Sequence, residues 1–158
     1  PDGAVQHYDK KHLFTFGGEH KRFTAGTERV VVNFRGVRIL LEVCYDLRFP
    51  VWSRNLGDYD MILYVASWPT PRVDAWSALL RARAIENQCY VAGVNRMGTD
   101  PTCEYSGGSA IIDPYGKTIA ECPWSRESAV SADIDMEALQ AFRKKFPVLD
   151  DADPFTLI

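Results

Sequence analysis

The chain has 158 residues, of which 46% are hydrophobic, 12% aromatic and 25% charged, a composition typical of one globular domain with a packed core. Its net charge of −3 disfavours binding to phosphate backbones or anionic membranes, which requires clustered Lys and Arg. The longest apolar runs, 37–44 and 61–68, are far shorter than the roughly 20 residues that span a bilayer. We therefore expect neither nucleic acid nor a membrane as a partner.

In the first part of the chain, strands are predicted where β-branched and aliphatic residues cluster. Residues 30–34 and 37–43 are two such runs, and Arg35-Gly36 between them fits a hairpin turn. The second run leads directly into Cys44. A helix is then predicted over 50–56, because proline is favoured at the first helical position.

The rest of the chain alternates between strand and helix patterns. The predicted elements are a strand over 61–66, a helix over 73–88 with Trp76, Leu79, Leu80 and Ala84 at helical spacing, a strand over 89–95, a hairpin of 109–113 and 118–121, and a strand over 129–134. Asp135 fits the N-cap of a last helix over 136–146, which has basic residues in its last turn. An acidic tail follows over 147–158. This order predicts one α/β domain over 1–158.

Cysteine usage and the start of the chain bear on the compartment. Cys44, Cys89, Cys103 and Cys122 form no CxxC pair and no dense framework, which suits a reducing environment. Residues 1–10 lack the basic start and apolar centre of a secretory signal. We therefore predict a cytoplasmic protein.

Cys44 is the cysteine whose position favours chemistry. It follows an apolar strand and precedes a predicted helix, where a helix dipole would lower the pKa of the thiol and favour a nucleophile. The alternative is a small buried hydrophobic residue. A different enzyme hypothesis pairs Cys44 with His12 or His20 as the general base, as in Cys-His hydrolases. A metal site built from these histidines, His7 and Cys44 is disfavoured, because the spacings fit no common zinc pattern.

Two separated motifs resemble one known family. Tyr8-Asp9-Lys10-x-His12-Leu13-Phe14 and Cys44-Tyr45-Asp46-Leu47-Arg48-Phe49-Pro50 are similar to the nitrilase (carbon-nitrogen hydrolase) superfamily, as are the 81–87 segment and the 107–116 hairpin. Residues 9–14, 48–55 and 64–69 most resemble its omega-amidase branch, which hydrolyses the terminal amide of 2-oxo-dicarboxylic acid monoamides. The resemblance implies the α-β-β-α four-layer sandwich of that superfamily and a small-molecule amide substrate.

The resemblance also implies roles for individual residues. It makes Cys44 the nucleophile, Lys10 the catalytic lysine and Glu19 a positioning glutamate of the catalytic site, while Lys11 is a surface neighbour. The Tyr45 backbone N–H would help to stabilise the oxyanion. No cofactor and no metal is implied. Arg83 and Glu86, at i, i+3 spacing, are expected to form a structural ion pair.

Substrate contacts are predicted after the strand 61–66, where α/β ligand sites gather. Trp68 and Arg72 lie there, and the Arg72 guanidinium is suited to hold a substrate carboxylate.

Family resemblance further implies a general-base glutamate ahead of the lysine motif. We therefore expect the chain to be the C-terminal three-fifths or so of the family domain, to need the preceding segment of that domain as a partner, and to be nearly inactive alone, since losing a general base typically costs about 10²- to 10⁴-fold in rate. A base-less fragment or a non-catalytic binding module is the alternative. A homo-oligomer is expected, with 49–56 and the tail 147–158 as contact candidates.

Overall fold

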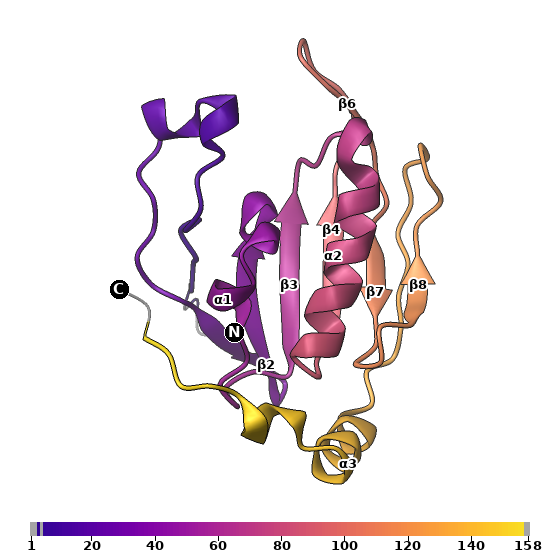
Figure 1. Ribbon diagram of the computed structural model, residues 1–158. Helices are drawn as coiled ribbons and strands as arrows, with labels where there is room; N and C mark the ends of the chain where they lie inside the picture. Colours follow the sequence, from indigo (N-terminus) through magenta and orange to yellow (C-terminus); the bar gives the residue numbers. More distant parts are fainter. Residues whose placement is uncertain (1–2, 4, 157–158) are drawn as a thin grey trace.

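A mixed six-stranded sheet organises the molecule (Figure 1). The computed structural model describes residues 3 and 5–156. The strands lie in the order β1-β2-β3-β4-β7-β8. Their bounds are β1 Val31–Phe34, β2 Val37–Val43, β3 Met61–Ala66, β4 Tyr90–Asn95, β7 Ala110–Ile112 and β8 Thr118–Glu121. Each of these strands was predicted from the sequence to within one or two residues.

The centre of the sheet is parallel and its flanks are antiparallel. β3 pairs in parallel with β2 on one side and with β4 on the other, with Ile62 opposite both Leu40 and Val91. β1 and β7 then pair antiparallel with β2 and β4. The turn between β1 and β2 is the predicted Arg35-Gly36, where both residues have positive φ (52° and 84°), as tight hairpin turns require. Because β2, β3 and β4 run in parallel, the residues that follow them share one edge of the sheet.

Helix α2 (Val73–Glu86) covers one face of this sheet. Its Trp76, Leu80 and Ala84 are buried in one cluster with residues of β2, β3, β4 and β7, as their spacing predicts. The helix approaches β4 so closely that a Cβ on Gly93 would lie 2.5 Å from the Leu80 side chain. α2 ends two residues earlier than predicted, because Gln88 has a left-handed backbone (φ 44°) that a helix cannot continue through.

The segment after β2 differs from the prediction. A 3-10 helix, η3 (Cys44–Arg48), begins directly at Cys44 and is followed by the short helix α1 (Pro50–Ser53). Proline occupies the first turn of α1 as predicted, but the helix does not extend to residue 56. The chain leaves the helix because Asn55 bonds to Asn87 through both its backbone N–H and its side chain, 2.9 and 3.0 Å away.

Two further differences lie in the second half. The predicted strand over 129–134 is wrong: these residues have no strand partner and are mostly exposed. The sequence analysis also missed an antiparallel ribbon of β5 (Met97–Thr99) and β6 (Glu104–Ser106), which follows β4. Its strands have three residues each, too short for an alternating pattern to be recognised.

The last helix is attached to the end of the sheet opposite the carboxyl ends of β2 to β4 (Figure 1). α3 (Met136–Lys145) begins as predicted at Asp135, whose side chain accepts a hydrogen bond from the Ala138 N–H. Arg143 of α3 donates to the buried Asp60 at 3.0 Å, and Asp60 also accepts from Arg38 at 2.7 Å. The remaining 3-10 turns are η1 (Thr15–Gly17), η2 (Glu19–Lys21), η4 (Thr70–Arg72) and η5 (Val148–Asp151). Within the described residues, no helix is long and apolar enough to cross a membrane.

Candidate active site

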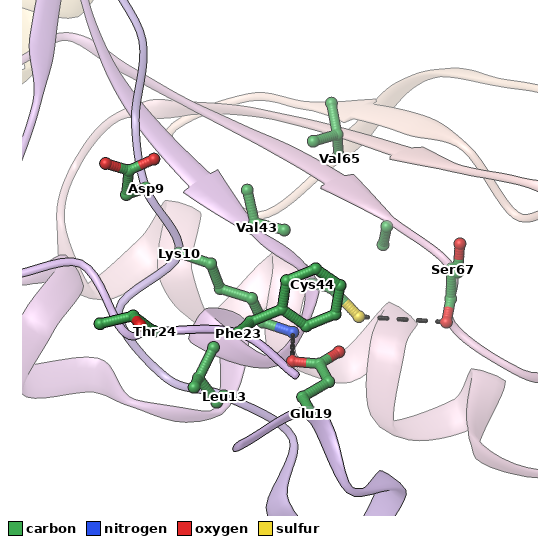
Figure 2. A pocket seen from close by; sticks show the side chains of 11 residues that line it. Asp9, Lys10, Leu13, Glu19, Phe23, Thr24, Val43, Cys44, Val65 and Ser67 are labelled. Atoms are coloured by element: carbon green, nitrogen blue, oxygen red, sulfur yellow. Dashed lines mark hydrogen bonds and ion pairs between the residues drawn. The ribbon is translucent and has the colours of Figure 1, made fainter. Parts of the chain in front are cut away.

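A cavity of about 570 Å³ opens at the carboxyl ends of β2 and β3 (Figure 2). Residues of three chain segments line it: Asp9, Lys10, Leu13, Glu19, Phe23 and Thr24 before the sheet, Val43 and Cys44 at the end of β2, and Val65, Ala66 and Ser67 at the end of β3. The three residues that the sequence analysis placed in the catalytic site, Lys10, Glu19 and Cys44, therefore share one cavity.

Cys44 occupies the junction between β2 and η3. Its backbone has positive φ (50°), which is uncommon for a residue with a side chain, and its Sγ lies 4.0 Å from the carbonyl oxygen of Ser67. Burial raises the pKa of the Cys44 thiol, while the nearby Lys10 ammonium acts in the opposite direction. The prediction that a helix dipole lowers this pKa is thus wrong. The helix here is a single 3-10 segment of five residues, and the largest influence on the thiol is the cost of removing a thiolate from water.

Lys10 and Glu19 form a close ion pair within the cavity. Lys10 Nζ lies 2.6 Å from Glu19 Oε2, and the same oxygen accepts a hydrogen bond from the Phe14 backbone N–H at 2.8 Å. Burial alone would raise the pKa of Glu19, but the hydrogen bonds from Lys10 and Phe14 hold it below its usual value. A carboxylate with a low pKa is a weak base, so this geometry suits Glu19 to holding the Lys10 ammonium in place.

The residue next to Lys10 does not share this site. Lys11 is not among the residues that line the cavity, and its ammonium lies 5.1 Å from the centre of the Trp52 ring. It is therefore a neighbour of the site, as the resemblance implied.

The predicted substrate-binding residues surround a second, small cavity beside the first. Its volume is about 40 Å³, and its lining comprises Phe14, Glu19, Cys44, Tyr45, Arg48, Trp68, Pro69 and Arg72. The Trp68 indole N–H donates to the Arg72 carbonyl at 2.7 Å, and the Arg72 guanidinium lies 5.5 Å from the Phe14 ring centre. Because Cys44 and Glu19 line both cavities, the structure brings all six predicted site residues together.

The alternative base residues do not lie in these cavities. The His12 ring is stacked on Phe49, 3.8 Å between centroids, and its Nδ1 lies 2.8 Å from Asp46 Oδ1. His20 is exposed and lines neither cavity. Across residues 3 and 5–156, no three His, Cys, Asp or Glu side chains gather in a way that could hold a metal ion. The Cys-His and metal hypotheses therefore find no geometric support.

Several residues around the site were not singled out from the sequence. Phe23 and Thr24 line the main cavity and Arg48 the small one, where its guanidinium lies 4.9 Å from the Trp68 ring centre. Phe23 and Thr24 lie in a stretch without a regular pattern, so no periodicity indicated them. The buried Glu42 could have been found, because it lies two residues after Leu40 on a strand and therefore on the same face.

The expected ion pair on α2 is present. Arg83 Nη1 lies 2.8 Å from Glu86 Oε1, and the same guanidinium donates to the Leu47 carbonyl. Since Arg83 is 3% exposed, its contact with Leu47 fastens η3 to α2 and so supports the turn that carries Cys44.

The comparison with known families agrees with this geometry. Residues 1–144 match the family model described as carbon-nitrogen hydrolase. The chain belongs to the carbon-nitrogen hydrolase family. This membership confirms the resemblance found in the sequence.

Curated and solved relatives of this carbon-nitrogen hydrolase are closely similar to it. It is 55% identical to "Omega-amidase YafV" of Escherichia coli (strain K12) over 99% of the chain and 62% of that protein. It is 42% identical to "2-oxoglutaramate amidase" of Bacillus subtilis (strain 168) over 93% of the chain and 57% of that protein. The chain therefore spans about three-fifths of the length of these relatives.

A crystal structure establishes the fold. XC1258 from Xanthomonas campestris, described as a CN-hydrolase superfamily protein with an arsenic adduct in the active site, superposes with a TM-score of 0.96 at 49% identity. The match covers all of this chain and 63% of the other. The predicted α/β fold of the nitrilase type is thus confirmed.

Proposed function

We propose that this carbon-nitrogen hydrolase releases ammonia from the terminal amide of a small linear 2-oxo-dicarboxylic acid monoamide, with Cys44 as the nucleophile. The observation that carries the proposal is the shared cavity of Cys44, Lys10 and Glu19. Similarity to an omega-amidase and to a 2-oxoglutaramate amidase supports this substrate class.

The chemistry proceeds in two halves. The Cys44 sulfur attacks the amide carbonyl carbon, a tetrahedral intermediate forms, and the carbon-nitrogen bond breaks to leave a thioester. A general base takes the thiol proton and returns it to the nitrogen, which departs as ammonia. We assign this role to the glutamate that the family resemblance places ahead of the lysine motif, because the lowered pKa of Glu19 makes Glu19 a poor proton acceptor. Water then attacks the thioester and releases the carboxylic acid and the free thiol. Because burial raises the pKa of Cys44, removal of its proton must accompany the attack.

Lys10 is suited to stabilise the negative oxygen of the intermediate. Its ammonium group lies in the cavity and is held by Glu19, with 2.6 Å between Lys10 Nζ and Glu19 Oε2. A positive charge held in place in this way stabilises a negative oxygen more strongly where water is excluded. The Tyr45 backbone N–H, the first after the nucleophile, is the second proposed donor. Glu19 has the positioning role, because its lowered pKa makes it a poor acceptor for the thiol proton.

The far end of the substrate is assigned to the small cavity. Arg72 provides a guanidinium for the carboxylate, and the Trp68 ring provides an apolar wall. A hydrogen bond to a charged group contributes about 1.5 to 3 kcal/mol, so losing it should weaken binding by about 10- to 150-fold.

Ammonia release from 2-oxoglutaramate, with glutamine, asparagine and butyramide for comparison, tests the function. We expect 2-oxoglutaramate to be the best substrate and its acyl group to appear on Cys44 by intact-mass spectrometry. Arg72→Gln should raise KM for 2-oxoglutaramate by about 10-fold or more and leave the rate with butyramide nearly unchanged. Preference for glutamine, or an equal loss with both amides in the variant, contradicts the proposal.

Compartment and assembly are also proposed. The four cysteines are all free, which suits the reducing cytoplasm and is checked by cell fractionation. Val51 on α1, Leu56 and Phe155 are 54%, 66% and 42% exposed, and such apolar residues are typical of subunit contacts. We infer a homo-oligomer through these surfaces; light scattering that shows a strict monomer at high concentration contradicts it.

A further inference from the structure

Asp46 joins two segments that are far apart in the sequence. Its Oδ1 accepts the His12 backbone N–H and contacts His12 Nδ1, both at 2.8 Å. Its Oδ2 accepts the Tyr8 hydroxyl at 2.9 Å and the Val43 backbone N–H at 3.0 Å. The side chain is fully buried, so these four contacts replace the water that a carboxylate loses on folding.

The two segments are those that carry the proposed catalytic groups. Tyr8 and His12 lie two residues on either side of Lys10, while Val43 and Asp46 lie on either side of Cys44. Further contacts stiffen the first segment: the Tyr8 hydroxyl accepts the Trp52 indole N–H at 3.1 Å, and the His12 ring is stacked on Phe49. The same carboxylate thus fastens the lysine segment to the nucleophile turn.

We propose that Asp46 is a positioning residue, which sets the distance between the Lys10 ammonium and the Cys44 sulfur by holding the segment 8–12 against the turn 43–46. This inference rests on the proposed roles of Lys10 and Cys44. Asp46 touches neither cavity, so it acts through Lys10 and has no contact with the substrate.

Thiol reactivity distinguishes this role from general support of the fold. The charged groups that shift the pKa of the Cys44 thiol are Lys10, Glu19 and Asp46 itself. Arg48 and Arg72 also line the small cavity with Cys44, and they are the same in every variant tested. If Asp46 acted only through its negative charge, Asp46→Asn would make the thiolate easier to form and lower the pH midpoint of alkylation. If Asp46 positions Lys10, loss of the carboxylate moves the ammonium away and raises that midpoint. The two roles predict opposite signs.

The experiment measures the rate of Cys44 alkylation by iodoacetamide from pH 6 to 10, by peptide mass spectrometry on folded protein. We expect Lys10→Met to slow alkylation at pH 7.5 by about tenfold, equivalent to about one pKa unit. Asp46→Asn should raise the midpoint in the wild-type background and lower it in the Lys10→Met background. A lowered or unchanged midpoint in the wild-type background overturns the proposal.

Tyr8→Phe is the second variant, and it carries the test where Asp46→Asn does not fold. It removes the hydrogen bond to Asp46 and those that the hydroxyl accepts from the Trp52 indole and the Lys11 backbone N–H, without changing any charge. It should slow alkylation at pH 7.5 by about threefold, which is about half of the Lys10 effect in pKa units and corresponds to a partial displacement. The matched control is Tyr105→Phe, which removes the 2.7 Å hydrogen bond from Tyr105 to Asp100 on the β5–β6 ribbon.

The variants also separate the two proposals. The Tyr8→Phe effect should be absent from Tyr105→Phe and from the Lys10→Met background. An equal effect of both tyrosine variants, or no effect of Tyr8→Phe, overturns the positioning role. If Lys10→Met leaves the midpoint unchanged, the fault lies instead with the role proposed for Lys10.

Discussion

Cys44→Ala should abolish ammonia release from 2-oxoglutaramate, with a loss of at least about 10³-fold. No thioester can form without the sulfur, and Cys44 is the cysteine that lines the cavity with Lys10 and Glu19. Intact-mass spectrometry of substrate-treated protein should show an acyl adduct in the wild type and none in the variant. Initial rates of ammonia release measure the loss.

The control is Cys103→Ala, because Cys103 is partly buried like Cys44 but lies in the loop between β5 and β6. It should retain the adduct and the wild-type rate. Cys44→Ala protein that keeps more than a few per cent of the activity, or an adduct found on another cysteine, would falsify the assignment of the nucleophile.

Glu42→Gln should remove most of the alkaline loss of stability of the protein. Glu42 is 1% exposed, and neither carboxylate oxygen has a hydrogen-bond partner. Burial raises the pKa of Glu42 to about 9, the negative charge of Asp46 adds to this, and Arg29 and Arg83 oppose it. The folded protein therefore keeps this carboxyl protonated over much of the neutral range.

The direction in which pH changes the free energy of unfolding follows from proton binding. Between pH 4.5, the ordinary value, and about 9, the folded state holds the Glu42 proton and the unfolded state does not. The free energy of unfolding must therefore fall as pH rises through this window, by at most about 1.4 kcal/mol per pH unit from this residue. A glutamine has no proton to lose, so the variant should be similar to the wild type at pH 5 and more stable by several kcal/mol at pH 8.5.

Urea unfolding at pH 5, 7 and 8.5 measures the difference. Glu104→Gln serves as the control, because Glu104 is exposed on β6 and its replacement should leave the pH dependence of wild-type protein intact. If the free energy of unfolding depends on pH in the same way for the wild type and Glu42→Gln, the Glu42 carboxyl titrates normally and the account of its burial is wrong.

The sequence predicted the central elements because their signals are local. β2 and β3 are marked by clusters of β-branched and aliphatic residues, and α2 is marked by Trp76, Leu80 and Ala84 at helical spacing. All three form within two residues of their predicted bounds. The strand over 129–134 was wrong because alternation alone does not supply a hydrogen-bonding neighbour. The β5–β6 ribbon has strands too short to carry a pattern.

The residues predicted for the site lie near one another in the structure, but the direction of the Cys44 pKa shift was not predicted correctly. Motif resemblance selected Lys10 and Cys44, the position after a buried strand selected Arg72, and the structure places all three around two adjoining cavities. The direction of the Cys44 pKa shift was mispredicted, because the burial of the thiol depends on residues from all parts of the fold and not on its neighbours in the sequence. The contacts of Asp46 with residues 34 and 38 positions away were likewise beyond any local pattern. The expectation that the chain alone is nearly inactive stays a prediction, since the chain spans about three-fifths of the length of its relatives.

The left-handed backbone at Cys44 limits how the nucleophile can be exchanged. At φ 50°, a β-branched side chain crowds its own carbonyl, and even an ordinary residue is strained by roughly 1 to 2 kcal/mol. Serine can enter this position at no more strain than cysteine, whereas threonine and valine cannot. Serine is therefore the aliphatic hydroxyl residue suited to replace Cys44 as a nucleophile that forms an ester in place of a thioester. When position 44 is randomised, the variants that fold should carry mainly glycine or small, unbranched side chains.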